Sequence, residues 1–378
     1  MDNLLTREKS GTQLHDLDDL LIVFLVIAAV SLLRGLLEGY AYYHVITEGV
    51  FILFYGFYFV FLRNKSLLQI KKLTMALVIF SFIVSIEYLL LTFQEGKIAT
   101  IALQRIVTRQ PYIALFTVPV LVSNIFFQKR IWIKILSIIA AFPIIAMVLI
   151  SQWRGLWLGF LISSFAVVFL ALNRDKFSFQ KILKFIVLLI LIMTTLVITI
   201  LIIDQLFIGS AIVSLLNRGL SFTDVMGDDS IIMRISDTRR AWQQMQGSIV
   251  DILFGKGLGA SYDRNSIYMT YPYQVDCTYI YIFWKMGLVG LLTFLLIGFK
   301  VFKKGFYAFK NTQDLFIKYI TASLLSGFIG LYIASITSVC SIIYQFTIVW
   351  AFMISAVEIV YLKVRSEIII PRRNNEQV

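Results

Sequence analysis

The chain has 378 residues, of which 59% are hydrophobic and 15% charged, and its mean hydropathy is +0.84. Soluble globular proteins are only about half apolar, so this composition excludes a water-soluble globular protein and predicts an all-α, polytopic membrane protein. The formal net charge of +12 is high enough for nucleic-acid binding. The basic residues, however, lie in loops between apolar runs, and we therefore expect no nucleic-acid partner.

Ten apolar runs have about the length of a membrane-spanning helix, which is roughly 17–25 residues. A further stretch, residues 204–275, separates the seventh run from the eighth, and so long a connection is usually functional. The sequence thus predicts membrane helices 1–7 in residues 1–203, one large loop in residues 204–275 and membrane helices 8–10 in residues 276–378, all within one integral membrane domain. In chain order the runs are residues 18–33, 45–62, 73–93, 111–127, 131–150, 155–172, 182–203, 278–302, 315–337 and 342–362.

Most of the 34 Lys and Arg residues lie in every second loop between these runs. Under the positive-inside rule, the side that carries the excess is cytoplasmic. Both termini are then predicted to be cytoplasmic and the loop at residues 204–275 to be extracytoplasmic. Because this asymmetry accounts for the net charge, the charge indicates the membrane topology and does not indicate a ligand.

Few charged residues lie within or beside the apolar runs, and carboxylates at such positions are functional candidates by default. Glu87 lies deepest, and it is compatible both with a proton-coupled transporter and with a buried, hydrogen-bonded carboxylate. The spacing of His, Cys and Asp residues does not resemble a metal site, so we expect none. The charged residues in question are Arg34, Glu38, Glu48, Glu87 and Glu358.

Two cysteines, Cys277 and Cys340, fall at similar depth near the predicted outer surface. Spacing alone does not establish that two cysteines are close enough to pair. We expect two free, buried thiols, with a disulfide as the alternative.

Residues 151–159, SQWRGLWLG, place a lone arginine between two apolar runs. Arg154 directly precedes the sixth run, and the predicted topology places this helix start at the outer surface. The unpaired N–H groups and the positive end of the helix dipole favour an anion there, and a guanidinium binds phosphate oxygens in bidentate fashion. Arg154 is therefore a candidate phosphate ligand, and an arginine that merely anchors the helix end is the structural alternative.

The large loop contains a stretch with apolar residues at helical spacing, namely Ile235, Trp242, Met245 and Ile249. This pattern predicts an amphipathic helix that lies on the membrane surface with its apolar side down. Arginines are disfavoured outside the cell by the positive-inside bias. Their presence on this side is explained if they bind an anionic head group. These arginines are Arg234, Arg239 and Arg240 in the large loop and Arg105 and Arg109 in another outer loop.

The sequence FGKGLG at residues 254–259 follows this stretch. A phosphate-binding P-loop needs four residues between its first glycine and Gly-Lys-Ser/Thr, and it follows a strand. The sequence meets neither condition, so we predict a backbone turn that ends a helix. Glycine there would permit a ligand to approach the backbone closely.

Asp276 lies two residues before the eighth run. Aspartate is a favoured N-cap, so one prediction is that its side chain accepts hydrogen bonds from the first N–H groups of this helix. A carboxylate at an outer-surface site can also take a proton from an incoming sugar hydroxyl. The two roles do not exclude each other.

The strings at residues 151–159, 254–259 and 276–290 occur in the order seen in the O-antigen ligase / O-antigen polymerase superfamily, which the chain resembles. That family has a Ser-Arg start to a mid-chain helix, then a large periplasmic loop with an Arg-containing helix before Pro-Leu-Leu-Gly-x-Gly. Last comes His-Asn-x-Tyr-Leu, with Gly-Leu-x-Gly eleven residues after the His. Here Asp276 takes the His position, Cys277 the Asn position, and Tyr279 and residues 287–290 match in register. The resemblance covers about residues 131–290 in detail and the whole chain in layout.

Two departures from the family pattern bear on whether the chain resembles the ligases or the polymerases more. Gln152 and Trp153 stand between Ser151 and Arg154, and histidine is absent at Asp276. The histidine is usual in ligases and variable in polymerases, so the resemblance favours a polymerase of lipid-linked oligosaccharide repeat units.

Such an enzyme transfers a glycan from undecaprenyl diphosphate to an acceptor sugar hydroxyl at the outer face of the bacterial inner membrane. The resemblance implies a metal-independent glycosyltransferase without a cofactor, with the lipid bilayer, a flippase and a chain-length regulator as partners. Arg154 and one loop arginine (Arg234, Arg239 or Arg240) would bind the diphosphate, and Asp276 would take the proton. Candidate substrate contacts are Arg105, Arg109 and Tyr279.

Two other functions remain open. A ligase would move the finished glycan to lipid A core or to protein. A membrane transporter, such as a flippase for lipid-linked oligosaccharide, belongs to a different class and commonly has inverted repeats and helices broken at the midplane. We find no internal repeat in the sequence, and one large loop on one side is more typical of a one-sided active site.

Overall fold

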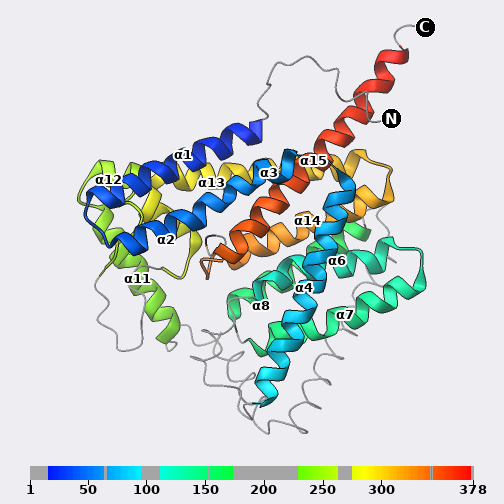
Figure 1. Ribbon diagram of the computed structural model, residues 1–378, viewed down its shortest axis with the longest axis horizontal. Coiled ribbons are helices and arrows are strands. Elements are labelled where there is room, and N and C mark those ends of the chain that lie inside the picture. The colour runs from blue at the N-terminus through cyan, green and yellow to red at the C-terminus, as the bar shows by residue number, and fades with distance from the viewer. Residues whose placement is uncertain are drawn as a thin grey trace.

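The computed structural model describes residues 16–63, 66–94, 111–151, 153–172, 229–262, 275–340, 342 and 344–375. Within these ranges the regular elements are all helices (Figure 1). In chain order they are α1 (Asp16–Leu37), α2 (Tyr42–Leu53), η2 (Phe54–Gly56), α3 (Phe57–Arg63), α4 (Leu67–Gln94), η3 (Pro111–Ile113), α6 (Ala114–Phe127), α7 (Ile131–Ile150), α8 (Arg154–Leu172), α11 (Asp229–Met245), α12 (Ile249–Phe254), α13 (Thr278–Asn311), α14 (Leu315–Ala334) and α15 (Tyr344–Asn375).

Eight helical segments among the described residues are long and apolar enough to cross a membrane. One of them, Tyr42–Arg63, is built from α2, η2 and α3. A shorter apolar segment, Pro111–Phe127, coincides with the fourth predicted run. The seventh predicted run, residues 182–203, lies outside the described residues, and every other predicted run coincides with an apolar helical segment. The prediction of a helical, polytopic membrane protein is confirmed to this extent.

Helices α14 and α15 form the inside of the bundle. In each of them 78% of the apolar window is buried, whereas the figure for α1 is 28%. Small residues let α8 pack closely on α14, since a Cβ on Gly159 would contact the carbonyl oxygen of Gly330 and one on Gly155 would overlap Thr337. Glycines spaced four residues apart are typical of tight helix contacts in membranes. The start of α8 is thereby fixed beside the end of α14.

The described basic loops gather at one end of the bundle. Asp16 at the start of α1 pairs with Lys300 in the second half of α13 at 3.0 Å, and the rings of Phe127 and Tyr319 join the end of α6 to the start of α14. Figure 1 places the start of α1 and the end of α15 toward one side, with α12 at the opposite end of α1. Helices α11 and α12 therefore lie away from the basic loops, as the alternate-loop pattern requires.

The glycine turn, residues 254–259, ends α12 as predicted, with Gly255 at the C-cap in the positive-φ region (φ 77°). Other backbone segments pack closely against this turn. Helix α13 is broken at Gly287 (φ 71°), where a Cβ would overlap the backbone of Leu253. On α1, a Cβ on Gly35 would overlap the carbonyl oxygen of Leu258. The glycines are thus needed because three backbones meet there.

Replacing Gly35 by alanine should destabilise the protein, because the new methyl group overlaps backbone that cannot rotate away. We expect the free energy of unfolding to fall by roughly 1–3 kcal/mol, the usual cost of overpacking. The change is measured as a lower midpoint of thermal unfolding in detergent. Gly247→Ala is the matched control, since a Cβ there meets nothing within 4 Å. Equal midpoints for the two variants would contradict this packing.

Candidate active site between α11 and α13

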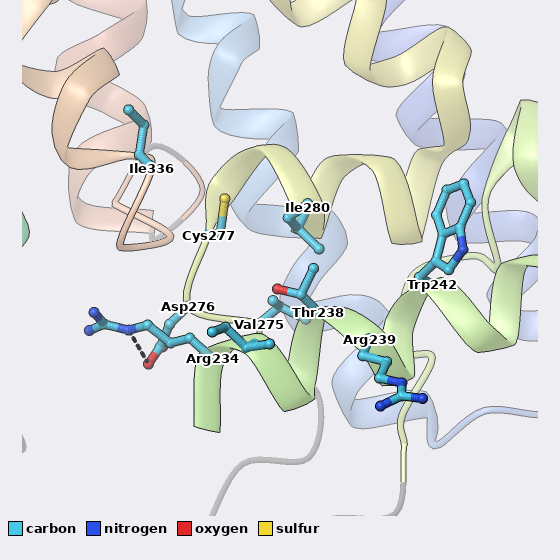
Figure 2. A pocket seen from close by; sticks show the side chains of 10 residues that line it. Arg234, Thr238, Arg239, Trp242, Val275, Asp276, Cys277, Ile280 and Ile336 are labelled. Carbon is cyan, nitrogen blue, oxygen red and sulfur yellow. Dashed lines mark ion pairs between the residues drawn. The ribbon is translucent and has the colours of Figure 1, made fainter. Parts of the chain in front are cut away.

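A pocket of about 430 Å³ lies between α11 and the residues that lead into α13 (Figure 2). This volume falls in the range of about 300–1,000 Å³ that is typical of small-molecule sites. Its apolar wall is contributed by three segments that are distant in sequence. The residues of this wall are Ile235, Trp242, Val275, Ile280 and Ile336.

The polar groups of the pocket centre on Arg234 and Asp276. Arg234 Nε lies 3.8 Å from Asp276 Oδ2, and the two side chains are 32% and 40% exposed. At 3.8 Å the contact is an ion pair without a hydrogen bond, and Arg234 Nε is shielded from solvent with no hydrogen-bond partner. The two charged groups therefore do not saturate each other's hydrogen-bonding capacity.

The structure distinguishes between the three loop arginines that the sequence left equivalent. Arg239 also lines the pocket, but in Figure 2 its guanidinium extends away from the Arg234–Asp276 pair. Arg240 is half-buried and does not line the pocket. Arg234 alone of the three is brought to Asp276.

The prediction that Asp276 caps α13 is wrong. The N-cap is Cys277, and no side-chain cap hydrogen bond is formed there. The first helical N–H, that of Thr278, instead donates to the carbonyl oxygens of Ser335 (2.9 Å) and Ser338 (3.2 Å). Because the loop after α14 satisfies this donor, the Asp276 carboxylate is not needed as a cap and is available to Arg234.

Arg154 begins α8 and does not line the pocket. The loop at residues 335–338 nevertheless links it to the Arg234–Asp276 pair. Gly155 packs on Thr337 of this loop, and Tyr112, whose ring contacts the Trp153 ring at 5.1 Å, hydrogen-bonds Ser338. Tyr112 also lies close enough to the pair for both charges to act on its hydroxyl.

The other predicted contacts are not brought to the pocket. The Tyr279 hydroxyl donates to the carbonyl oxygen of Tyr332 at 2.7 Å, and its ring packs against Phe294. Tyr279 thus faces the aromatic core of the bundle. Arg105 and Arg109 lie outside the described residues.

The predicted amphipathic stretch forms α11 and the start of α12, and its apolar residues are partly buried against the protein and partly exposed. Met245 is fully buried against α13, in a cluster with Trp284. Ile235 and Ile249 are 61% and 73% exposed, and Trp242 stacks on Phe283 at 5.8 Å. The helix thus packs on the protein with one side and presents apolar residues outward with the other.

A buried ionic contact next to the site was missed by the sequence reasoning. Lys285 of α13 is 0% exposed and its Nζ lies 3.2 Å from Glu48 Oε1 of α2. Glu48 was recognised as a charge within an apolar run, but its partner was not. The signal was present, because Lys285 interrupts the eighth run at its eighth residue.

A second ionic group joins α12 to the end of α1. Asp251 accepts hydrogen bonds from Lys256 Nζ (2.6 Å) and from Arg34. Burial alone would raise the pKa of Asp251, but these two cations hold the pKa below its ordinary value. Arg34 also donates to the carbonyl oxygen of Gly255, so the end of α12 is held by charge as well as by packing.

Both cysteines are free thiols, as predicted, but only Cys340 is buried and Cys277 is half-buried. Among the described residues, no group of three or more His, Cys, Asp and Glu side chains is placed to hold a metal ion. Comparison of the chain with known protein families finds no match, and no curated protein matches it.

Proposed function

We propose that the protein is a repeat-unit polymerase for a bacterial surface polysaccharide. It acts as a metal-independent glycosyltransferase of the bacterial inner membrane, with a glycan on undecaprenyl diphosphate as donor. The acceptor is a sugar hydroxyl of a second lipid-linked repeat unit. The observation that carries this proposal is the Arg234–Asp276 pair, which combines an anion-binding group and a base in one pocket.

In the proposed reaction, the acceptor oxygen bonds to the anomeric carbon as the bond from that carbon to the diphosphate oxygen breaks. The hydroxyl proton passes to Asp276, a step for which a positioned carboxylate is suited. The departing diphosphate carries the negative charge, which the Arg234 guanidinium neutralises with its fork of donors. Arg154, at the N-terminus of α8, is assigned to the same diphosphate, with Arg239 and Arg240 as further cationic groups on the loop.

The surroundings of the pocket suit a substrate that is anchored in lipid. Its wall is largely apolar, and α11 and α12 expose apolar side chains beside it, Ile235 and Ile249 among them. A polyprenyl chain requires such a surface, whereas a free sugar nucleotide does not. The proposed site lies at the bundle end opposite the basic loops, which under the positive-inside rule is extracytoplasmic.

The proposed orientation is tested with single cysteines in a background that lacks Cys277 and Cys340. Gly247→Cys and Lys303→Cys place thiols at exposed positions at the two ends of the bundle. A membrane-impermeant maleimide should label the first but not the second in intact cells, and both after lysis. Labelling of Lys303→Cys in intact cells would reverse the assignment.

The chemistry is tested by Asp276→Asn, which preserves shape and removes the base. We expect polymer formation from purified lipid-linked repeat units, with chelator present, to fall by roughly 10²–10⁴-fold, the usual contribution of a positioned acid–base group. Asp314→Asn is the matched control, because Asp314 caps α14 through the N–H of Phe316 at 2.7 Å and Asn caps about as well. Full activity of Asp276→Asn would remove Asp276 from the mechanism. Transfer of single finished glycans without a polymer ladder would instead identify a ligase.

The role of Arg154 is tested by two substitutions compared at matched protein abundance. Arg154→Ala should abolish polymer, and Arg154→Lys should restore little, because an ammonium cannot reproduce the bidentate fork. Arg130→Ala removes an exposed arginine at the start of α7 and should leave polymer unchanged. Wild-type polymer in Arg154→Ala would reduce Arg154 to a helix anchor.

A further inference from the structure

The buried lysine beside the site is held by several groups at once. Lys285 Nζ pairs with Glu48, donates to the carbonyl oxygen of Ala260 and lies 4.3 Å from the centre of the Trp284 ring. Burying an ammonium is costly, and an ion pair repays this cost only when its remaining donors and acceptors are also satisfied. Lys285 meets this condition with partners from α2, from the segment after α12 and from α13 itself.

Glu48 and Lys285 together hold the glycine turn. The second carboxylate oxygen of Glu48 accepts the N–H of Gly259 at 2.7 Å. The break at Gly287 leaves carbonyl oxygens of α13 available, and those of Trp284 and Lys285 accept the N–H groups of Lys256 (2.8 Å) and Gly257 (3.1 Å). We refer to Glu48, Lys285 and the turn segment 255–260 as the Lys285 joint.

The joint is connected to α11 through the neighbour of Lys285. Trp284 Nε1 donates to Gln244 Oε1 at 2.9 Å, and Gln244 Nε2 donates to the carbonyl oxygen of Ser261 at 3.0 Å. Ala241 and Met245, one turn apart on α11, pack in the same cluster as Trp284. The end of α11 is therefore fastened to α13 and to the residue that directly follows the joint.

Both members of the candidate pair depend on this arrangement. Arg234 lies on α11, and Asp276 lies two residues before α13 begins. Their contact of 3.8 Å is not reinforced by a hydrogen bond between them. Since the pair is weak, its geometry must come from the elements that carry it.

We propose that Lys285 and Glu48 are positioning residues, which place Arg234 opposite Asp276 by holding α11 and the glycine turn on the broken helix α13. The chemical role of the Arg234–Asp276 pair rests on the proposed function, whereas the placement of the pair by the Lys285 joint does not. Neither Lys285 nor Glu48 lines the pocket, so they act through other residues.

The experiment measures proximity directly. Arg234→Cys and Asp276→Cys are combined in the full chain with Cys277→Ser and Cys340→Ser. A bifunctional methanethiosulfonate reagent then joins the two thiols, and the yield is measured by mass spectrometry of the linked peptides. Adding Lys285→Met, which removes the charge at similar volume, should lower the yield at least about fivefold, as expected for a coupling lost between two elements.

The molecule offers a matched control on the same helix. Lys304 of α13 is also buried and paired with a glutamate, with its Nζ at 2.7 Å from Glu358 Oε2 and at 5.1 Å from the centre of the Tyr361 ring. It lies in the second half of α13, away from the pocket. Lys304→Met should therefore destabilise the protein comparably and leave the cross-link yield unchanged.

A second variant covers failure of Lys285→Met to fold. Glu48→Gln/Lys285→Met removes both charges and keeps an oxygen for the N–H of Gly259, so no buried charge is left uncompensated. We expect this variant to accumulate and to show the same loss of cross-link. Unchanged yield in the folded double variant, or equal losses in the Lys285 and Lys304 variants, would overturn the proposal.

The polymer assay separates this inference from the proposed function. If both hold, the Lys285 variants lose polymer together with the cross-link, whereas Lys304→Met retains both at matched abundance. Loss of the cross-link in the Lys285 variants, together with a wild-type protein that makes no polymer, would refute the polymerase assignment and leave the positioning role supported.

Discussion

The buried ion pair between Lys285 and Glu48 is the contact on which our account of the pocket end of the bundle rests. It joins α2 to α13 at a point where α13 is broken at Gly287 and its carbonyl oxygens are open to other donors. N–H groups of the glycine turn donate hydrogen bonds to these carbonyl oxygens. A buried backbone segment needs such partners, because unpaired polar groups are costly away from water.

The two buried lysines of α13 divide the molecule into two ends with different tasks. Lys304 and Glu358 join α13 to α15 within the bundle, near the end that carries the basic loops. Lys285 and Glu48 lie where α11 and α12 pack on α13, at the end of the bundle that holds the pocket. In a membrane protein such pairs are expensive, so each is expected where two elements must meet in one arrangement. Only the second pair stands next to the candidate site.

The candidate site combines rigid support with a weak central contact. Glycine packing fixes α8 on α14, and the loop at residues 335–338 supplies the acceptors for the first N–H of α13. Arg234 and Asp276, by contrast, meet at 3.8 Å without a hydrogen bond. A firmly held frame around groups that are not saturated by each other is what preorganised binding of a charged ligand requires.

The sequence by itself determined the helices, because long apolar runs can satisfy their backbone in lipid only as helices or closed barrels. It also determined the turn at residues 254–259 and the segregation of basic loops, since both follow from local residue type. Only the tertiary structure decided which loop arginine meets Asp276, that Cys277 and not Asp276 is the N-cap, and that Tyr279 faces the core. It alone revealed the partner of Lys285, 237 positions earlier in the chain. Helical periodicity specifies which side of one helix is apolar, but it contains no information about which distant backbone will satisfy a given N–H or charge. Those choices follow from packing between elements.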